Sequence, residues 1–278
     1  MRIGIRTNAP EVLRQLPAHL PPGWTPSPSA VVDELFSLWV GGSSRGNANV
    51  RRYNLLYWGA ARRARSLDLD SVFETLESDV RLSVASGARR RTFVHAGVVG
   101  WKGRAIVLPG RTFSGKSTLV AELLRAGATY YSDELAVLDA RGRVHPFPKS
   151  LAIREAGNGT GRYPPEALGS VSGVGPLPVG LIAFTSYRRG RRWRPVRLTT
   201  GRGLLALVAH TVAVRRRTEA SLRALRQTVA PALVLKGLRG EAGETAGALL
   251  RRLERETGPT GPTALASSRK KTQNVPQV

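Results

Sequence analysis

The chain of 278 residues lacks cysteine altogether. Disulfides, thiolate metal sites and a cysteine nucleophile are therefore excluded. Long apolar runs are also missing, because the longest, LLALVAHTVAV at Leu204–Val214, contains His210 and is shorter than the roughly 20 residues that span a bilayer. The N-terminal segment MRIGIRTNAPEVLRQLP has no apolar region followed by a small-residue cleavage site, so no secretory signal is expected. These absences predict a cytoplasmic protein without a membrane partner.

Acidic residues are scarce: 19 Asp and Glu stand against 43 Lys and Arg, which gives a net charge of +24. Such a charge is typical of proteins that bind nucleic acid, an anionic membrane or an acidic ligand. The basic residues are spread along the whole chain without regular aromatic interleaving, so nucleic acid is not the expected partner. A surface of this sign favours polyanionic ligands such as nucleoside triphosphates.

Three regions are expected along the chain. Residues 1–88 form an N-terminal region with a short strand, RIGIRT, a Pro-rich connector, Pro17–Ser29, and helices. Residues 89–256 form the core, and residues 257–278 lack apolar periodicity and are expected to be disordered. The core pattern predicts a hairpin (TFVHAGVVG and RAIVLPG), a helix (KSTLVAELLRAG), a second hairpin (YYSDELAVLD and VHPFP), three more strands (VGLIAFTSYRRG, RPVRLTT and ALVLKGLRG), and helices at 204–214, 221–229 and ETAGALLRRLERE.

The stretch GRTFSGKST between the first hairpin and its helix fits the phosphate-loop spacing G-x-x-x-x-G-K-[ST]. Glycines let backbone N–H groups turn inward around phosphates, the lysine places a cation on the β- and γ-phosphates, and the following hydroxyl can ligate Mg²⁺. The sequence therefore predicts ATP and Mg²⁺ as cofactors. The predicted nucleotide-binding residues are Gly110, Arg111, Thr112, Phe113, Ser114, Gly115, Lys116, Ser117 and Thr118.

Two further groups of polar residues flank this loop in the sequence. Asp133 and Glu134, in SDEL, follow Lys116 by 17 and 18 residues, so a short helix and a return strand would bring them back beside the phosphates. One carboxylate could bind the metal while the other accepts a proton from an attacking hydroxyl. His95 precedes Lys116 by 21 residues, on the strand that leads into the hairpin. Solvated acids at a turn and a structural histidine are the alternative interpretations.

The succession VHAG, hairpin, GRTFSGKST and SDEL resembles the HPr kinase/phosphorylase family over roughly Thr92–Asp139. The resemblance implies an α/β (α+β-like) fold: a P-loop kinase core with a mixed, largely antiparallel sheet, similar to phosphoenolpyruvate carboxykinase, here with an N-terminal extension. It implies ATP-dependent phosphorylation of a protein serine. Lys116 would then contact nucleotide, Asp133 would be the catalytic base, and His95 would match the family's active-site histidine. Ser117 and Glu134 would be metal ligands.

Other parts of the chain depart from that family. Its later acidic signature is reduced here to LAIREAG, with Ala152 where an acid would stand and Glu155 in place of a glycine. The family's P-G-R-N loop is echoed by TTGRG, which makes Arg202 the candidate phosphate-binding arginine. These departures are similar to divergent relatives that phosphorylate ribosomally made peptides such as lasso-peptide precursors. Members of the family often form hexamers, so a homo-oligomer is compatible with the resemblance.

Three functions remain open on the sequence. The first is a kinase whose acceptor is a serine-type hydroxyl of a peptide or protein. The second is a P-loop ATPase or switch without a phosphoacceptor, although no LSGGQ-type segment supports a transporter ATPase. The third is a basic nucleic-acid-binding module for which ATP is secondary. The kinase accounts for the loop, the acidic pair and the histidine together.

Overall fold

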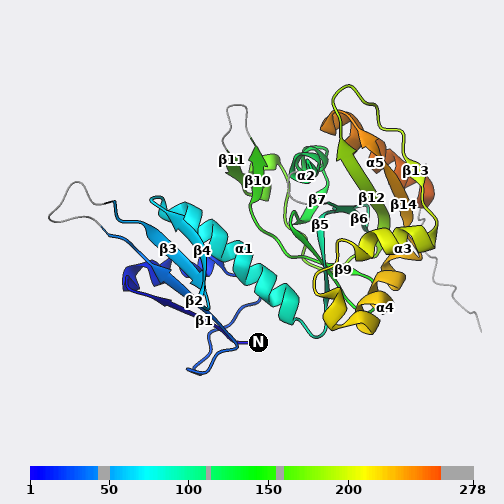
Figure 1. Cartoon of the computed structure of the whole chain (residues 1–278). Coiled ribbons are helices and arrows are strands. Elements are labelled where there is room, and N and C mark those ends of the chain that lie inside the picture. The colour runs from blue at the N-terminus through cyan, green and yellow to red at the C-terminus, as the bar shows by residue number, and fades with distance from the viewer. Residues whose placement is uncertain (43–50, 111–113, 155–159, 258–278) are drawn as a thin grey trace, which may run out of the picture.

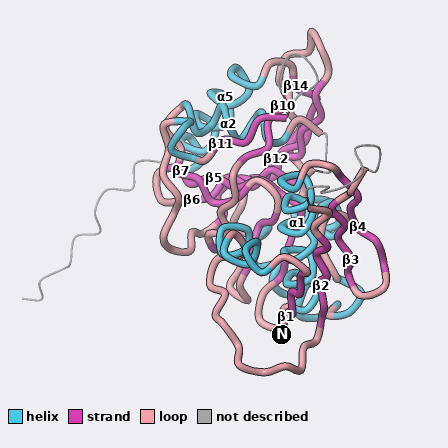
Figure 2. The backbone as a smooth tube through the Cα atoms, turned by 90° about the vertical axis from the view of Figure 1, so that its left-hand side faces the viewer, coloured by secondary structure: helices cyan, strands magenta, loops and turns pink. Residues whose placement is uncertain are grey.

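The computed structural model describes residues 1–42, 51–110, 114–154 and 160–257. Strands and helices are mixed along the chain, and the strands form one four-stranded, one two-stranded and one eight-stranded sheet. Both Figure 1 and Figure 2 show the four-stranded sheet to one side of the eight-stranded sheet. No helix among the described residues is long and apolar enough to cross a membrane.

The described residues up to Gly87 form a sheet covered by a helix. The strands are β1 (Ile3–Thr7), β2 (Glu34–Trp39), β3 (Asn54–Trp58) and β4 (Ala61–Ser66), followed by helix α1 (Leu69–Gly87) and preceded by the short 3₁₀ helices η1 (Pro10–Arg14) and η2 (Leu16–His19). β1 and β2 are parallel and the other two pairings are antiparallel. Alternate residues of the sheet, including Phe36 and Leu56, are fully buried against Phe73 and Leu76 of α1. The region expected to hold one strand and helices therefore contains a four-stranded sheet beside its helices.

The eight-stranded sheet contains most of the remaining strands, and its main path follows the order β13-β14-β12-β6-β5-β8-β9, with β7 paired to β5. Its strands are β5 (Thr92–Trp101), β6 (Arg104–Pro109), β7 (Thr129–Ser132), β8 (Leu135–Leu138), β9 (Val144–His145), β12 (Val179–Tyr187), β13 (Val196–Arg197) and β14 (Leu233–Arg239). A separate antiparallel pair is made by β10 (Leu151–Arg154) and β11 (Thr160–Tyr163), ahead of the short 3₁₀ helix η3 (Pro165–Leu168). The expected mixed sheet, with a majority of antiparallel pairings, is confirmed.

Helices cover both faces of this sheet because its central strands are apolar on both sides. The helices are α2 (Lys116–Arg125), α3 (Thr200–Val208), α4 (Thr218–Val229) and α5 (Ala242–Thr257), with the short 3₁₀ helix η4 (Val214–Arg216) before α4. Val99 and Ile106 pack in the core that contains α2 and α5, whereas their neighbours Val98 and Val107 pack in the core that contains α3 and α4. This alternation produces three layers, helices–sheet–helices.

The three strands β6, β12 and β14 are mutually parallel in the order β6-β12-β14. Their carboxyl ends therefore meet at one edge of the sheet, which is where ligands bind in open α/β sheets. The predicted phosphate loop leaves β6 at this edge. The other strand flanking β6 is β5, which is antiparallel to it and forms the predicted hairpin.

Most elements predicted in the core are confirmed, including the second hairpin β8–β9 and the helices α2, α4 and α5. The segments VGLIAFTSYRRG and RPVRLTT are strands, but β14 lies between them in the sheet. The helix expected at 204–214 is displaced: α3 covers Thr200–Val208. The predicted disordered tail begins with Thr257, the last residue of α5, and its remainder, 258–278, lies outside the described residues.

Candidate phosphate-binding site

The loop between β6 and α2 starts beside β5. The N–H of Gly110 donates to the carbonyl of His95, with N and O 3.2 Å apart. Arg111, Thr112 and Phe113 lie outside the described residues. Gly115 is the N-cap of α2 with φ of 78°, a conformation that favours glycine over other residues. Ser114 therefore leads directly into a helix N-terminus, where backbone N–H groups and the helix dipole favour an anion.

Lys116, the first residue of α2, extends across β5 at Gly97. A Cβ atom added at Gly97 would lie 3.2 Å from Cγ of Lys116 and 2.6 Å from Cγ2 of Val120, so this glycine provides the space for the lysine stem. Burial lowers the pKa of Lys116, while the nearby charges of Asp133 and Glu134 act in the opposite direction. The predicted phosphate-binding cation thus lies with the predicted acidic pair.

Asp133 is a buried carboxyl group at the end of β7, with 9% of its surface exposed. Burial raises the pKa of Asp133 to about 6, although the charge of Lys116 and a hydrogen bond with Ser117 favour the ionised form. Its Oδ1 has no hydrogen-bond partner among the described residues. The predicted base, the predicted metal-binding hydroxyl and the predicted cation are therefore neighbours, as their spacing in the sequence indicates.

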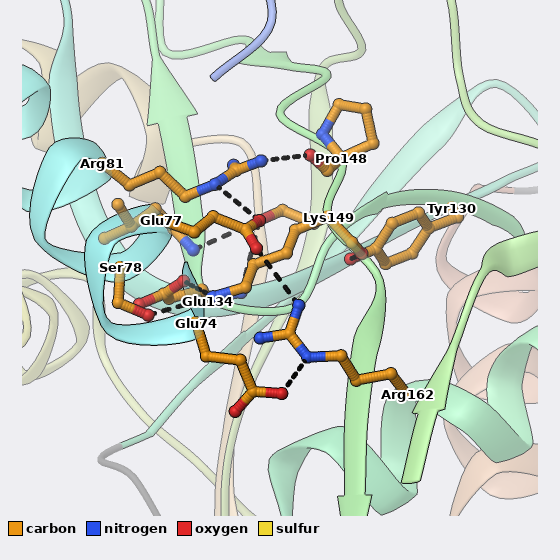
Figure 3. A network of polar contacts seen from close by, with 11 residues as sticks. Glu74, Glu77, Ser78, Arg81, Tyr130, Glu134, Pro148, Lys149 and Arg162 are labelled. Atoms are coloured by element: carbon orange, nitrogen blue, oxygen red, sulfur yellow. Dashed lines mark hydrogen bonds and ion pairs between the residues drawn. The ribbon is translucent and has the colours of Figure 1, made fainter. Parts of the chain in front are cut away.

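Glu134 turns its carboxylate toward Lys149, whose Nζ lies 3.0 Å from Oε2 of Glu134 (Figure 3). The same ammonium donates to the hydroxyl of Ser78 in α1 at 3.1 Å. Glu134 is thus part of an ion pair in this structure, and its role as a metal ligand stays a prediction. No cluster of three or more metal-binding side chains occurs in the described parts of the chain.

A network of charged groups joins α1 to this side of the site. Arg162 donates to Glu74 at 2.5 Å and to Glu77 at 3.1 Å, and Arg81 donates to the carbonyl of Pro148, next to Lys149 (Figure 3). Partly or fully buried ion pairs of this kind restrict the geometry of the groups that they join. The helix of the N-terminal region therefore supports the segment that carries Lys149.

His95 lies on β5 at the edge where the loop begins. Its backbone N–H donates to the carbonyl of His210, and its carbonyl accepts from Gly110. The residue lies at the surface, but the surrounding atoms remove part of the hydration of its ring, and this desolvation, with the charge of Lys116, lowers the pKa of His95. The histidine is therefore adjacent to the loop and favours the neutral form, which suits a hydrogen-bonding partner better than a permanent cation.

Arg202 is exposed in the first turn of α3, and its backbone N–H donates to the hydroxyl of Thr199. The opposite end of this helix approaches the site, where His210 contacts His95. Nine residues of helix span about 13 Å, and Arg202 forms no ion pair with any described residue. The role of Arg202 as a phosphate-binding arginine stays a prediction.

Arg239, the last residue of β14, contacts the loop at Gly115, and the sequence motifs do not indicate this contact. Its Nη2 donates to the carbonyl of Gly115 at 2.7 Å, and its Nη1 donates to the carbonyl of Gly240 at 2.9 Å. Only 2% of its surface is exposed, and burial lowers the pKa of Arg239. Because Gly115 and Arg239 are 124 residues apart, local spacing gives no signal for this contact.

The residues at the start of α2 fit a hydrated magnesium ion. Mg²⁺ prefers oxygen ligands, keeps several waters and uses one or two carboxylates together with phosphate oxygens. Ser117 offers a hydroxyl and Glu134 a carboxylate, both of them oxygen donors, and in this structure the Glu134 carboxylate is paired with Lys149. This donor set matches the ion in chemistry.

Replacing Gly97 by alanine is expected to weaken ATP binding about tenfold, since the added methyl group would displace the stem of Lys116 or the side chain of Val120. Calorimetric titration of ATP measures the effect. Gly100→Ala is the matched control on the same strand, because its Cβ would contact Leu177 at 2.9 Å and Tyr131 at 3.0 Å, away from the lysine. Equal losses of affinity in both variants would contradict a specific role for Gly97.

Comparisons with known proteins leave the family open. No protein-family model matches the chain, and no curated protein sequence matches it. Among solved structures, the HPr(Ser) kinase/phosphatase from Coxiella burnetii is similar, with a TM-score of 0.32 and 15% sequence identity over 59% of this chain and 97% of that chain. At that TM-score the likeness does not indicate the function of this chain.

Proposed function

We propose that this chain is an ATP- and Mg²⁺-dependent kinase that transfers the γ-phosphoryl group to a serine-type hydroxyl of a peptide or protein, with ribosomally made peptide precursors as candidate acceptors. One observation carries the proposal: the buried Asp133 carboxyl lies with Lys116 and Ser117 at the N-terminus of α2. The unpaired oxygen of this buried carboxyl is available to accept the proton of an acceptor hydroxyl. The same carboxyl would activate water in an ATPase, and detection of a labelled acceptor distinguishes the two functions.

Each residue has a distinct task in this proposal. The helix N-terminus and Lys116 bind the β- and γ-phosphates, and the lysine charge balances the charge that develops on the transferred group. The acceptor oxygen forms a bond to the γ-phosphorus while the bond to the β–γ bridging oxygen breaks. Asp133 takes the proton of the acceptor hydroxyl. Bound Mg²⁺ supplies further charge neutralisation and geometry at the phosphates.

Incubating the full chain with γ-labelled ATP, Mg²⁺ and a mixed library of serine-containing peptides tests the proposal. The expected result is label on peptide serine, and replacement of the serines by alanine should remove it. The same reaction records free phosphate. Phosphate release without a labelled peptide or protein would favour an ATPase or switch and overturn the kinase.

A further inference from the structure

The phosphate loop has two different sides, defined by the strands that flank β6. Asp133 follows β7, which pairs with β5 on one side of β6. Tyr187 and Arg239 end β12 and β14, which lie on the other side. A nucleoside triphosphate has its reactive γ-phosphate at one end and its base at the other. On the proposed function, Asp133 is at the γ end, so the nucleoside extends toward β12 and β14.

Tyr187 stands directly beside the loop. The last pair of the β6–β12 ladder joins Ile182 to Val107, and β12 continues five residues further, past the end of β6 at Pro109. A Cβ atom added at Gly115 would lie 3.7 Å from Cβ of Tyr187. Half of the tyrosine's surface, 50%, is exposed, although it belongs to a strand in the middle of the sheet. A large aromatic ring at this place is open to a ligand.

Arg239 contacts both the Tyr187 ring and the loop. Its guanidinium lies 5.4 Å from the centre of the Tyr187 ring, a cation–π contact, and it donates to the Gly115 carbonyl. Its Nε has no hydrogen-bond partner among the described residues, and none of the carboxylates described lies within ion-pair distance of it. The negative charge of Glu241 and the two carbonyl acceptors stabilise the buried guanidinium, which therefore holds the Tyr187 ring and the loop together.

We propose that Tyr187, backed by Arg239, is the stacking platform for the base of the bound nucleotide. The residue is adjacent to Gly115, on the side of the loop away from Asp133, and half of its surface is exposed. Aromatic rings bind bases by stacking and are tolerant of base identity, because every base has a π-face. The inference rests on the proposed function for the direction of the phosphate chain, but it concerns nucleotide binding and not the acceptor.

Tyr187→Ala in the full chain is expected to lower ATP affinity about tenfold and to leave the affinity for inorganic tripolyphosphate unchanged. Both affinities are measured by calorimetric titration with Mg²⁺ present. Tyr187→Phe keeps the ring and should retain wild-type ATP affinity. Tyr57→Ala, which removes a tyrosine from β3 in the N-terminal sheet, is the matched control and should change neither value.

Two results would overturn the platform: unchanged ATP affinity in Tyr187→Ala, or equal loss for ATP and tripolyphosphate, which would show damage to the loop. The proposed kinase can fail separately. If Tyr187→Ala behaves as expected and wild type labels no acceptor, the platform stands and the kinase is wrong. If wild-type protein binds neither ligand, both are wrong.

Discussion

Asp133→Asn is expected to reduce phosphoryl transfer to a peptide serine by about 100- to 10,000-fold, the range over which a positioned base contributes. ATP affinity should stay close to that of the wild type, because Lys116 and the N-terminus of α2, which bind the phosphates, are unchanged. Asparagine has nearly the shape of aspartate but cannot take a proton. Steady-state transfer from labelled ATP and calorimetric titration of ATP measure the two effects.

The stability of the same variant separates loss of chemistry from loss of the fold. Burial raises the pKa of Asp133 from 3.8 to about 6, so between these values the folded state binds more protons than the unfolded state. Ionisation of Asp133 therefore lowers the free energy of unfolding as the pH rises from about 4 to about 6. The whole destabilisation is present above pH 6. At neutral pH, without nucleotide and Mg²⁺, Asp133→Asn should unfold at the same temperature as wild type or higher. A variant with normal transfer would refute the assignment of the base.

The parts of the site that could be predicted from the sequence are those that depend on local spacing. His95, the loop and Asp133 belong to one continuous succession of hairpin, helix and return strand, and each connection is short. Once the hairpin and the helix form, the short connections between consecutive elements bring these residues to the same edge of the sheet. Their approach in space therefore follows from the order of elements along the chain.

The parts that could not be predicted depend on contacts between distant segments. Parallel pairing of β14 with β12 is decided by how the intervening helices pack, so nothing in ALVLKGLRG indicates that it lies between β12 and β13. The contact of Arg239 with Gly115 follows only from that pairing. The strand β4 of the N-terminal sheet could not be predicted for another reason: its sequence, ARRARS, is charged and largely exposed, so it lacks the apolar alternation that predicts a strand.

Lys116→Met is expected to lower phosphoryl transfer by about 100- to 1000-fold, the loss seen when one group that stabilises developing charge is removed. Unlike Asp133→Asn, it should also lower ATP affinity, because the lysine binds the phosphates. Methionine keeps the unbranched stem that packs beside Gly97, so the fold is not the cause. Kinetics of transfer and titration of ATP check both effects. Lys236→Met, on the exposed side of β14, is the matched loss of one lysine charge and should leave both near wild type.

Lys116→Arg sharpens this prediction, because it keeps the positive charge and changes the shape. The guanidinium is planar and broad, whereas the ammonium of lysine is a compact charge. The stem of Lys116 passes close to Gly97 in a partly buried position, so the wider group lacks space to reach the same point. We therefore expect Lys116→Arg to resemble Lys116→Met in transfer. Full activity of the arginine variant would show that net charge at the loop suffices, and would contradict a site in which one compact cation is positioned on the phosphates.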